Sequence, residues 1–134
     1  MNKNISHLKI KSISALFLVS DINHSIEFYT QQLGFEIQFL YEDFYCGIAK
    51  DGHSIHLKSG KPAKEERINR KNNEDADIVI STDNIEVLFS DFQNKPVDTL
   101  KALREMPYGK EFYITDPDNY IIAFIEGKNN PVSK

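Results

Sequence analysis

The chain has 134 residues, of which 40% are hydrophobic and 27% charged, and its net charge is −4. This length and composition predict one ordinary globular domain, and the negative charge argues against nucleic acid or an anionic membrane as a partner. The single cysteine, Cys46, cannot form an intrachain disulfide, and no apolar run approaches the roughly 20 residues of a membrane span. We therefore expect a cytoplasmic protein.

The first half of the chain is predicted to form a strand, a helix and three further strands. Branched apolar residues indicate a strand over 13–19, and Ser20-Asp21 then offers two good helix N-caps. The helix is indicated by apolar residues at helical spacing, namely Ile22, Ile26, Tyr29 and Leu33, and Gly34 ends it. The strands that follow are predicted over 35–41, 44–49 and 54–58, with an Asp-Gly turn before the last one.

The second half repeats this order. A strand over 77–81 precedes the capping residues Thr82, Asp83 and Asn84, and Pro96 forbids continuation of the helix. The helix itself is indicated by one apolar stripe: Ile85, Leu88, Phe89 and Phe92. Further strands are predicted over 99–103, 111–115 and 121–126, the last two joined by the turn Asp-Pro-Asp-Asn. The chain thus reads as βαβββ twice, an α+β fold.

The segment between the two halves is rich in charge and has no apolar period. We interpret residues 60–75 as a solvated linker rather than a basic patch, because acidic residues interrupt the lysines and arginines. The expected organisation is a single domain with modules at about 10–59 and 76–127.

Three motifs in this order resemble the glyoxalase/bleomycin-resistance/dioxygenase superfamily, also called vicinal oxygen chelate proteins. They are VSDINHSIEFYTQQLGFE, GHSIHL and GKEFYITDPDNYIIAFIE, and the resemblance extends from about Ile13 to Glu126. It implies paired βαβββ modules whose curled mixed sheets surround a cavity, commonly in a homodimer.

The resemblance also implies where a metal ion would be bound. The positions that match the ligands of the metal-dependent members are Ser14, His56, Asp77 or Ala76 depending on register, and Ala123. A catalytic divalent ion needs about three protein ligands and an open position. Because Ser14 is a poor ligand and Ala123 offers none, we predict no metal, no cofactor and no family-type catalysis.

Aromatic residues on the predicted strands favour a ligand-binding role instead. The expected site comprises Phe39, Phe44, His56, Tyr108, Phe112 and Ala123. Aromatic faces in a concave pocket stack on flat ligands. Phe39, Phe44 and His56 match positions of the bleomycin-resistance branch of this superfamily. The resemblance to that branch implies binding of a drug without catalysis. Asn119 replaces a usual glycine, and the absence of Trp removes a further stacking partner, so bleomycin itself is not the expected ligand.

The first hypothesis is therefore a metal-free, small-molecule-binding homodimer of bleomycin-resistance type, an antibiotic-resistance role, that sequesters or senses a partly aromatic ligand. The alternative is a metal-dependent lyase, isomerase or dioxygenase with unconventional ligands that include His56 and Asp77. A third possibility is a structural module whose cavity is filled by side chains. Fold alone does not separate these three, because function resides in the site.

Overall fold

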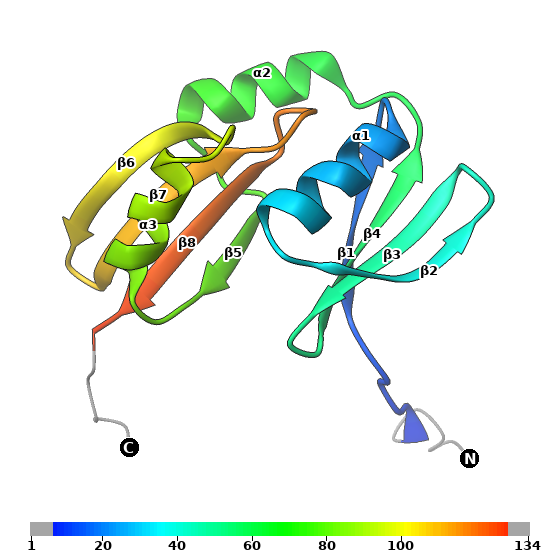
Figure 1. The fold of residues 1–134 in the computed structure, drawn as a ribbon, viewed down its shortest axis with the longest axis horizontal. Helices are drawn as coiled ribbons and strands as arrows, with labels where there is room; N and C mark the ends of the chain where they lie inside the picture. Colours follow the sequence, from blue (N-terminus) through cyan, green and yellow to red (C-terminus); the bar gives the residue numbers. More distant parts are fainter. Residues whose placement is uncertain (1–6, 129–134) are drawn as a thin grey trace.

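A computed structural model describes the fold of residues 7–128 of the protein. Two four-stranded sheets lie side by side, with β1 and β5 at their adjacent edges (Figure 1). The elements of the first module are β1 (Ser14–Val19), α1 (Ile22–Glu27), η2 (Phe28–Gln32), β2 (Glu36–Tyr41), β3 (Tyr45–Lys50) and β4 (His53–Ser59). The segment that follows contains α2 (Lys64–Asn73), and the second module contains β5 (Ile78–Ser81), α3 (Ile85–Gln93), β6 (Asp98–Met106), β7 (Gly109–Thr115) and β8 (Ile121–Gly127).

The two sheets share one topology. Their strand orders are β1-β4-β3-β2 and β5-β8-β7-β6, and in each the first pair is parallel while the others are antiparallel. Both sheets are therefore mixed, and the predicted duplicated βαβββ fold is confirmed.

The predicted turn chemistry is also present. Asp51 and Gly52 both have positive φ, as the hairpin between β3 and β4 requires, and Asn119 adopts the left-handed conformation in the β7–β8 turn. Asp21 Oδ1 accepts a hydrogen bond from the backbone N–H of His24 at 3.1 Å, which caps α1.

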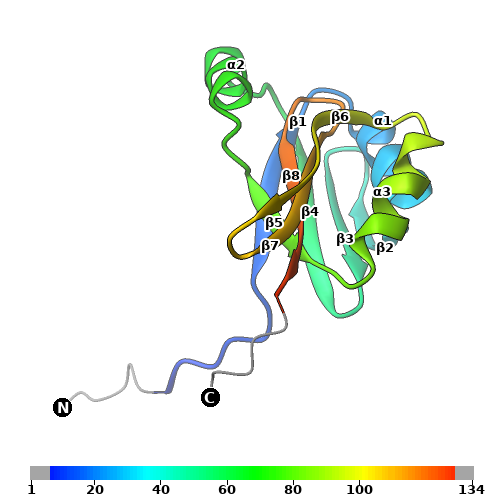
Figure 2. The ribbon, with the colours of Figure 1, turned by 90° about the vertical axis from the view of Figure 1, so that its left-hand side faces the viewer.

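Helices α1 and α3 cover the same face of the two sheets, and α2 lies on the opposite side at one end (Figure 2). Alternate strand residues point to opposite faces, so each sheet has a helix-facing side and an outer side. The helix-facing side holds the core; in the second module Phe112 and Phe124 stack at 5.0 Å and contact Phe92 of α3. None of the helices formed by residues 7–128 has the length and apolar character needed to span a bilayer.

The charged segment between the modules contains a helix that the sequence pattern did not indicate. Helix α2 buries one side chain, that of Arg67, and its apolar residue Ile68 is exposed. Arg67 lies over the ring of Tyr120 at 4.2 Å and donates from Nη1 and Nη2 to Asp77 at 2.7 and 2.9 Å. The Arg67 guanidinium therefore anchors α2, which explains why no apolar stripe in the sequence indicates this helix.

The β7–β8 turn joins the two modules. Tyr120 stacks on Phe17 of β1 with ring centroids 4.2 Å apart, and its hydroxyl donates to the carbonyl oxygen of Leu18 at 2.8 Å. The hydroxyl of Ser20 donates to Asp118 Oδ1 at 2.7 Å. The strong C-terminal hairpin thus both completes the second sheet and fixes it to the first module.

A buried carboxylate lies within this joint. Asp116 Oδ2 accepts a hydrogen bond from the Tyr29 hydroxyl at 2.7 Å, and its Oδ1 accepts from the backbone N–H groups of Asp118 and Tyr120. Burial raises the pKa of Asp116 from 3.8 to about 6, although these hydrogen bonds oppose the shift. Burial also raises the pKa of the Tyr29 hydroxyl well above its usual value, with the Asp116 charge adding to the effect.

Candidate ligand-binding site

Aromatic side chains gather around one histidine on the outer face of the first sheet. Strand pairing sets Leu16, His56, Gly47 and Phe39 side by side across β1, β4, β3 and β2. We define the His56 cluster as Phe39, Tyr41, Tyr45 and His56. Its side chains point away from α1, because the alternate residues Ile48, Ile55 and Leu57 are buried in the core.

The rings of this cluster are held in a defined geometry. The His56 ring meets Phe39 edge-on at 5.2 Å and Tyr45 at 5.5 Å, and the Phe39 and Tyr45 rings are stacked at 5.9 Å. The Tyr45 hydroxyl and His56 Nδ1 share a hydrogen bond of 2.8 Å. That bond orients the imidazole and leaves Nε2 for a ligand.

Gly47 makes room for the Phe39 ring. A Cβ atom at position 47 would lie 2.2 Å from Phe39 Cε2, well inside van der Waals contact. The glycine therefore lets Phe39 lie over β3, where it reaches both Tyr45 and His56. This close approach is a packing role that the sequence pattern did not reveal.

Of the predicted site residues, Phe39 and His56 are brought together and the others are not. Phe44 precedes β3, is 49% exposed, and makes no ring contact with the cluster among residues 7–128. Tyr108 lies in the β6–β7 hairpin at the far edge of the second sheet, and its hydroxyl donates to Glu111 Oε1 at 2.5 Å.

Two of the predicted wall residues offer no surface to a ligand. Phe112 is fully buried on the helix-facing side, where it contacts Phe89 and Phe92 of α3. The expectation that Phe112 lines a cavity is therefore wrong, because β7 turns Glu111 and Tyr113 outward instead. Ala123 does point outward, between Val79 and Tyr113, but it is only 1% exposed.

The residues at the family's metal-ligand positions do not fit a metal ion. The hydroxyl of Ser14 is hydrogen-bonded to that of Ser54, and Ala123 has no donor atom. Within residues 7–128, no group of three or more His, Cys, Asp or Glu side chains is arranged to hold a metal. His56 is left as a lone ligand, too few for a catalytic ion.

Asp77, the other ligand of the alternative hypothesis, is engaged by cations of the chain itself. Besides the two bonds from Arg67, it accepts from the backbone N–H of Ile121 at 2.7 Å, and Arg70 Nε lies 2.9 Å from its Oδ1. Burial by itself raises the pKa of Asp77, but the hydrogen bonds from Arg67 and Ile121 and the two arginine charges outweigh it and lower the pKa. The structure therefore gives Asp77 an architectural role.

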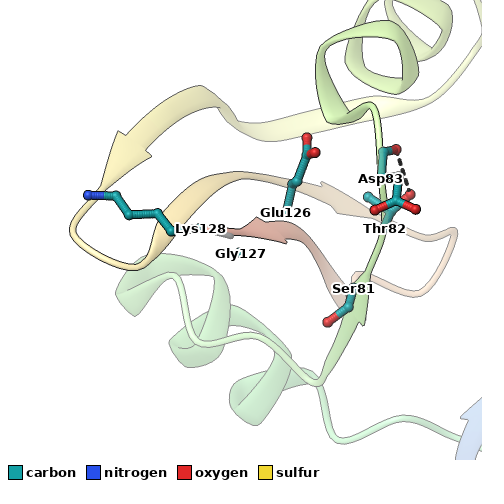
Figure 3. Close-up of a pocket in the computed structure, with 6 residues that line it drawn as sticks. All are labelled: Ser81, Thr82, Asp83, Glu126, Gly127 and Lys128. Carbon is teal, nitrogen blue, oxygen red and sulfur yellow. Dashed lines mark hydrogen bonds between the residues drawn. The ribbon is translucent and has the colours of Figure 1, made fainter. Parts of the chain in front are cut away.

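Two open hollows on the surface lie outside the His56 cluster. One is lined by polar residues and a glycine at the ends of β5 and β8: Ser81, Thr82, Asp83, Glu126, Gly127 and Lys128 (Figure 3). Glu126 in this hollow accepts a hydrogen bond from the backbone N–H of Ile85 at 3.1 Å, so it caps α3. The other hollow lies on the exposed side of α3. Neither hollow is lined by an aromatic side chain, whereas the His56 cluster offers several for stacking.

The comparisons with known proteins agree with the fold. The profile of the Glyoxalase/Bleomycin resistance protein/Dioxygenase superfamily matches residues 5–124. The chain therefore belongs to this superfamily, as its motifs predicted. No curated protein matches the sequence significantly.

Solved structures of similar shape include two that are named as binding proteins. UcmS2 superposes with a TM-score of 0.73 at 16% identity over 90% of this chain and 100% of that one. The bleomycin-binding protein from bleomycin-producing Streptomyces verticillus, complexed with copper(II)-bleomycin, gives 0.65 at 17% identity over 90% and 99%. TnmS3, an antibiotic binding protein from Streptomyces sp. CB03234, gives 0.67 at 22% identity over 91% and 100%. At these identities the likeness concerns the fold.

Proposed function

We propose that the protein binds a small, partly aromatic molecule at the His56 cluster without a metal, and so sequesters or senses it. The observation that carries this proposal is the geometry of Phe39, Tyr45 and His56: two stacked rings beside an oriented imidazole on an outer sheet face. Such a surface offers apolar stacking and one polar handle, the combination typical of small-molecule sites. The names of the bleomycin-binding and antibiotic-binding structures support the same class of function.

We further propose that the protein acts as a homodimer. The outer face around the cluster exposes the apolar side chains of Leu16, Leu18 and Tyr41, and Val79 is exposed on the outer face of the second sheet. Apolar area left in water is unfavourable, and a second copy with C2 symmetry would cover it and enclose the ligand. Light scattering at micromolar concentration should give twice the 15.4 kDa chain mass; the chain mass itself would reject the dimer.

A thermal-shift screen tests ligand binding. Planar aromatic and glycopeptide-like compounds are added to the protein with and without EDTA, since a compound that binds only the native state raises the melting temperature. A true ligand should act equally in EDTA and lose its effect in Phe39→Ala. The matched control is Phe44→Ala, an exposed aromatic outside the cluster, which should bind as the wild type does. A ligand whose effect vanishes in EDTA would instead support a metal-dependent protein.

A further inference from the structure

A second polar centre lies on the outer face of the second sheet, built around a buried carboxylate. Glu111 of β7 is 1% exposed, and a buried charge is stable only when it has partners. Arg104 of β6 donates to Glu111 Oε2 from Nε at 2.8 Å and from Nη2 at 2.5 Å, while Tyr108 donates to Oε1. Both carboxylate oxygens of Glu111 are thus hydrogen-bonded within the chain. The role of Glu111 is therefore to hold the side chains of Arg104 and Tyr108 in place.

The hydrogen bonds to Glu111 fix the orientation of the Arg104 guanidinium. With Nε and Nη2 directed to Glu111, the planar group leaves the N–H donors of Nη1 for another acceptor. The Arg104 side chain is 35% exposed, and its Cζ lies 5.8 Å from the centre of the Tyr113 ring. Unlike a lysine, it presents its charge as an oriented donor group.

Two tyrosines flank this donor. Tyr108 is 48% exposed, and Tyr113 is partly exposed on the same face, one pair further along β7. The centre therefore combines a cation held in place from behind with aromatic surface beside it. This combination fits an anionic group attached to a planar ring, because the anion meets Nη1 while the ring contacts tyrosine.

We propose that Arg104 binds the anionic group of a planar aromatic carboxylate, with Tyr108 and Tyr113 against its ring and Glu111 as a positioning residue. This site lies on a different sheet from the His56 cluster and does not depend on the function proposed above.

Benzoate is the probe, and its neutral analogue benzamide is the control ligand. NMR titration should show benzoate shifting the Arg104 Nε–H signal and the ring signals of Tyr108 and Tyr113, whereas benzamide at equal concentration leaves them unchanged. Arg104→Lys keeps the charge but loses the planar fork, so the Kd for benzoate should rise at least tenfold. Lys110→Gln removes a cation from the same hairpin on its helix-facing side, where it pairs with Glu86, and should leave the Kd unchanged.

Glu111→Gln separates positioning from simple folding support. In the folded variant, shown by an unchanged pattern of backbone amide signals elsewhere, benzoate affinity should still fall although Arg104 remains. Equal binding of benzoate and benzamide, or an unchanged Kd in Arg104→Lys or in folded Glu111→Gln, would overturn the proposal. Phe39→Ala should not alter the benzoate titration, so the two proposals fail separately.

Discussion

The two modules have the same strand order and the same parallel and antiparallel pairs, yet their outer faces differ in chemistry. The first sheet presents an aromatic cluster around His56, held by ring contacts and one hydrogen bond. The second sheet presents the ion pair of Arg104 and Glu111. Just before its strand β5, Asp77 forms further ion pairs. On the helix-facing sides both modules are built alike, from apolar side chains.

This difference shows which positions the fold constrains. Side chains between sheet and helix must fill a common core, so both halves use apolar residues there. Outer positions are free of that requirement, and they differ: the first sheet carries stacked aromatic rings and the second an ion pair. Perturbing each side should therefore have effects of different size and kind.

The largest loss of stability is expected when the ion pairs of Asp77 are broken. Asp77→Ala leaves the buried guanidinium of Arg67 without its partner, and breaking a buried ion pair typically costs about 3–5 kcal/mol. Urea denaturation should show this loss in the free energy of unfolding. Asp91→Ala removes the exposed pair that Asp91 of α3 forms with Lys95, just beyond the helix, and should cost less than about 1 kcal/mol. Equal effects of the two changes would contradict the assigned role of Asp77.

A smaller effect, visible as a pH dependence, is expected from the joint between the modules. Because the folded-state pKa of Asp116 is about 6 and its ordinary value is 3.8, the folded protein binds a proton more tightly than the unfolded chain. This contribution to stability is full below about pH 4 and is lost as the pH rises through 6, a change of about 2–3 kcal/mol. Asp77, with its lowered pKa, has the opposite sign and loses its contribution only as the pH falls below 3.8.

Asp116→Asn should remove the part of the pH dependence of stability that Asp116 contributes. Denaturation measured from pH 4 to pH 7 should then show a smaller fall in stability for the variant than for the wild type. Identical pH profiles would mean that Asp116 does not titrate in this range.

The smallest effect on stability is expected at the aromatic cluster. In Gly47→Ala the new methyl group displaces the Phe39 ring, which is at the end of a movable side chain, so the cost should be about 1–2 kcal/mol. Gly60→Ala, whose Cβ would lie 3.3 Å from the flexible Leu18 side chain, is the matched control and should cost less. Ligand affinity at the His56 cluster should fall in Gly47→Ala only, as measured by calorimetry.

Much of the fold could be predicted because local signals agree with it. The Asp21 cap, the Asp51-Gly52 turn and the left-handed Asn119 each mark a boundary where the structure has one. Helix α2 could not be predicted from periodicity, since Arg67 is its one buried residue and its anchor Asp77 lies beyond the end of the helix. Ion pairs made by tertiary structure leave no apolar pattern in the sequence.

The site could be predicted only in part, because strand parity decides which residues face outward. The sequence assigns Phe39 and His56 to one candidate site, and the structure puts their ring centroids 5.2 Å apart. Phe112 is expected on the outer face but lies in the core, since Glu111, Phe112 and Tyr113 give no clear alternation and a buried glutamate is not expected. The role of Tyr45 depends on a hydrogen bond across β3 and β4, which follows from the register of the pair rather than from spacing along the chain.

Metal-free binding at the His56 cluster can be tested by NMR mapping of a ligand from the thermal-shift screen. The measurement records ring and backbone signals of the protein in EDTA, with and without saturating ligand. We predict shifts centred on Phe39, Tyr45 and His56, including the His56 ring, and the same map after any metal is removed. Shifts confined to other parts of the molecule, or shifts that appear only when a divalent metal is added back, would contradict metal-free binding at the His56 cluster.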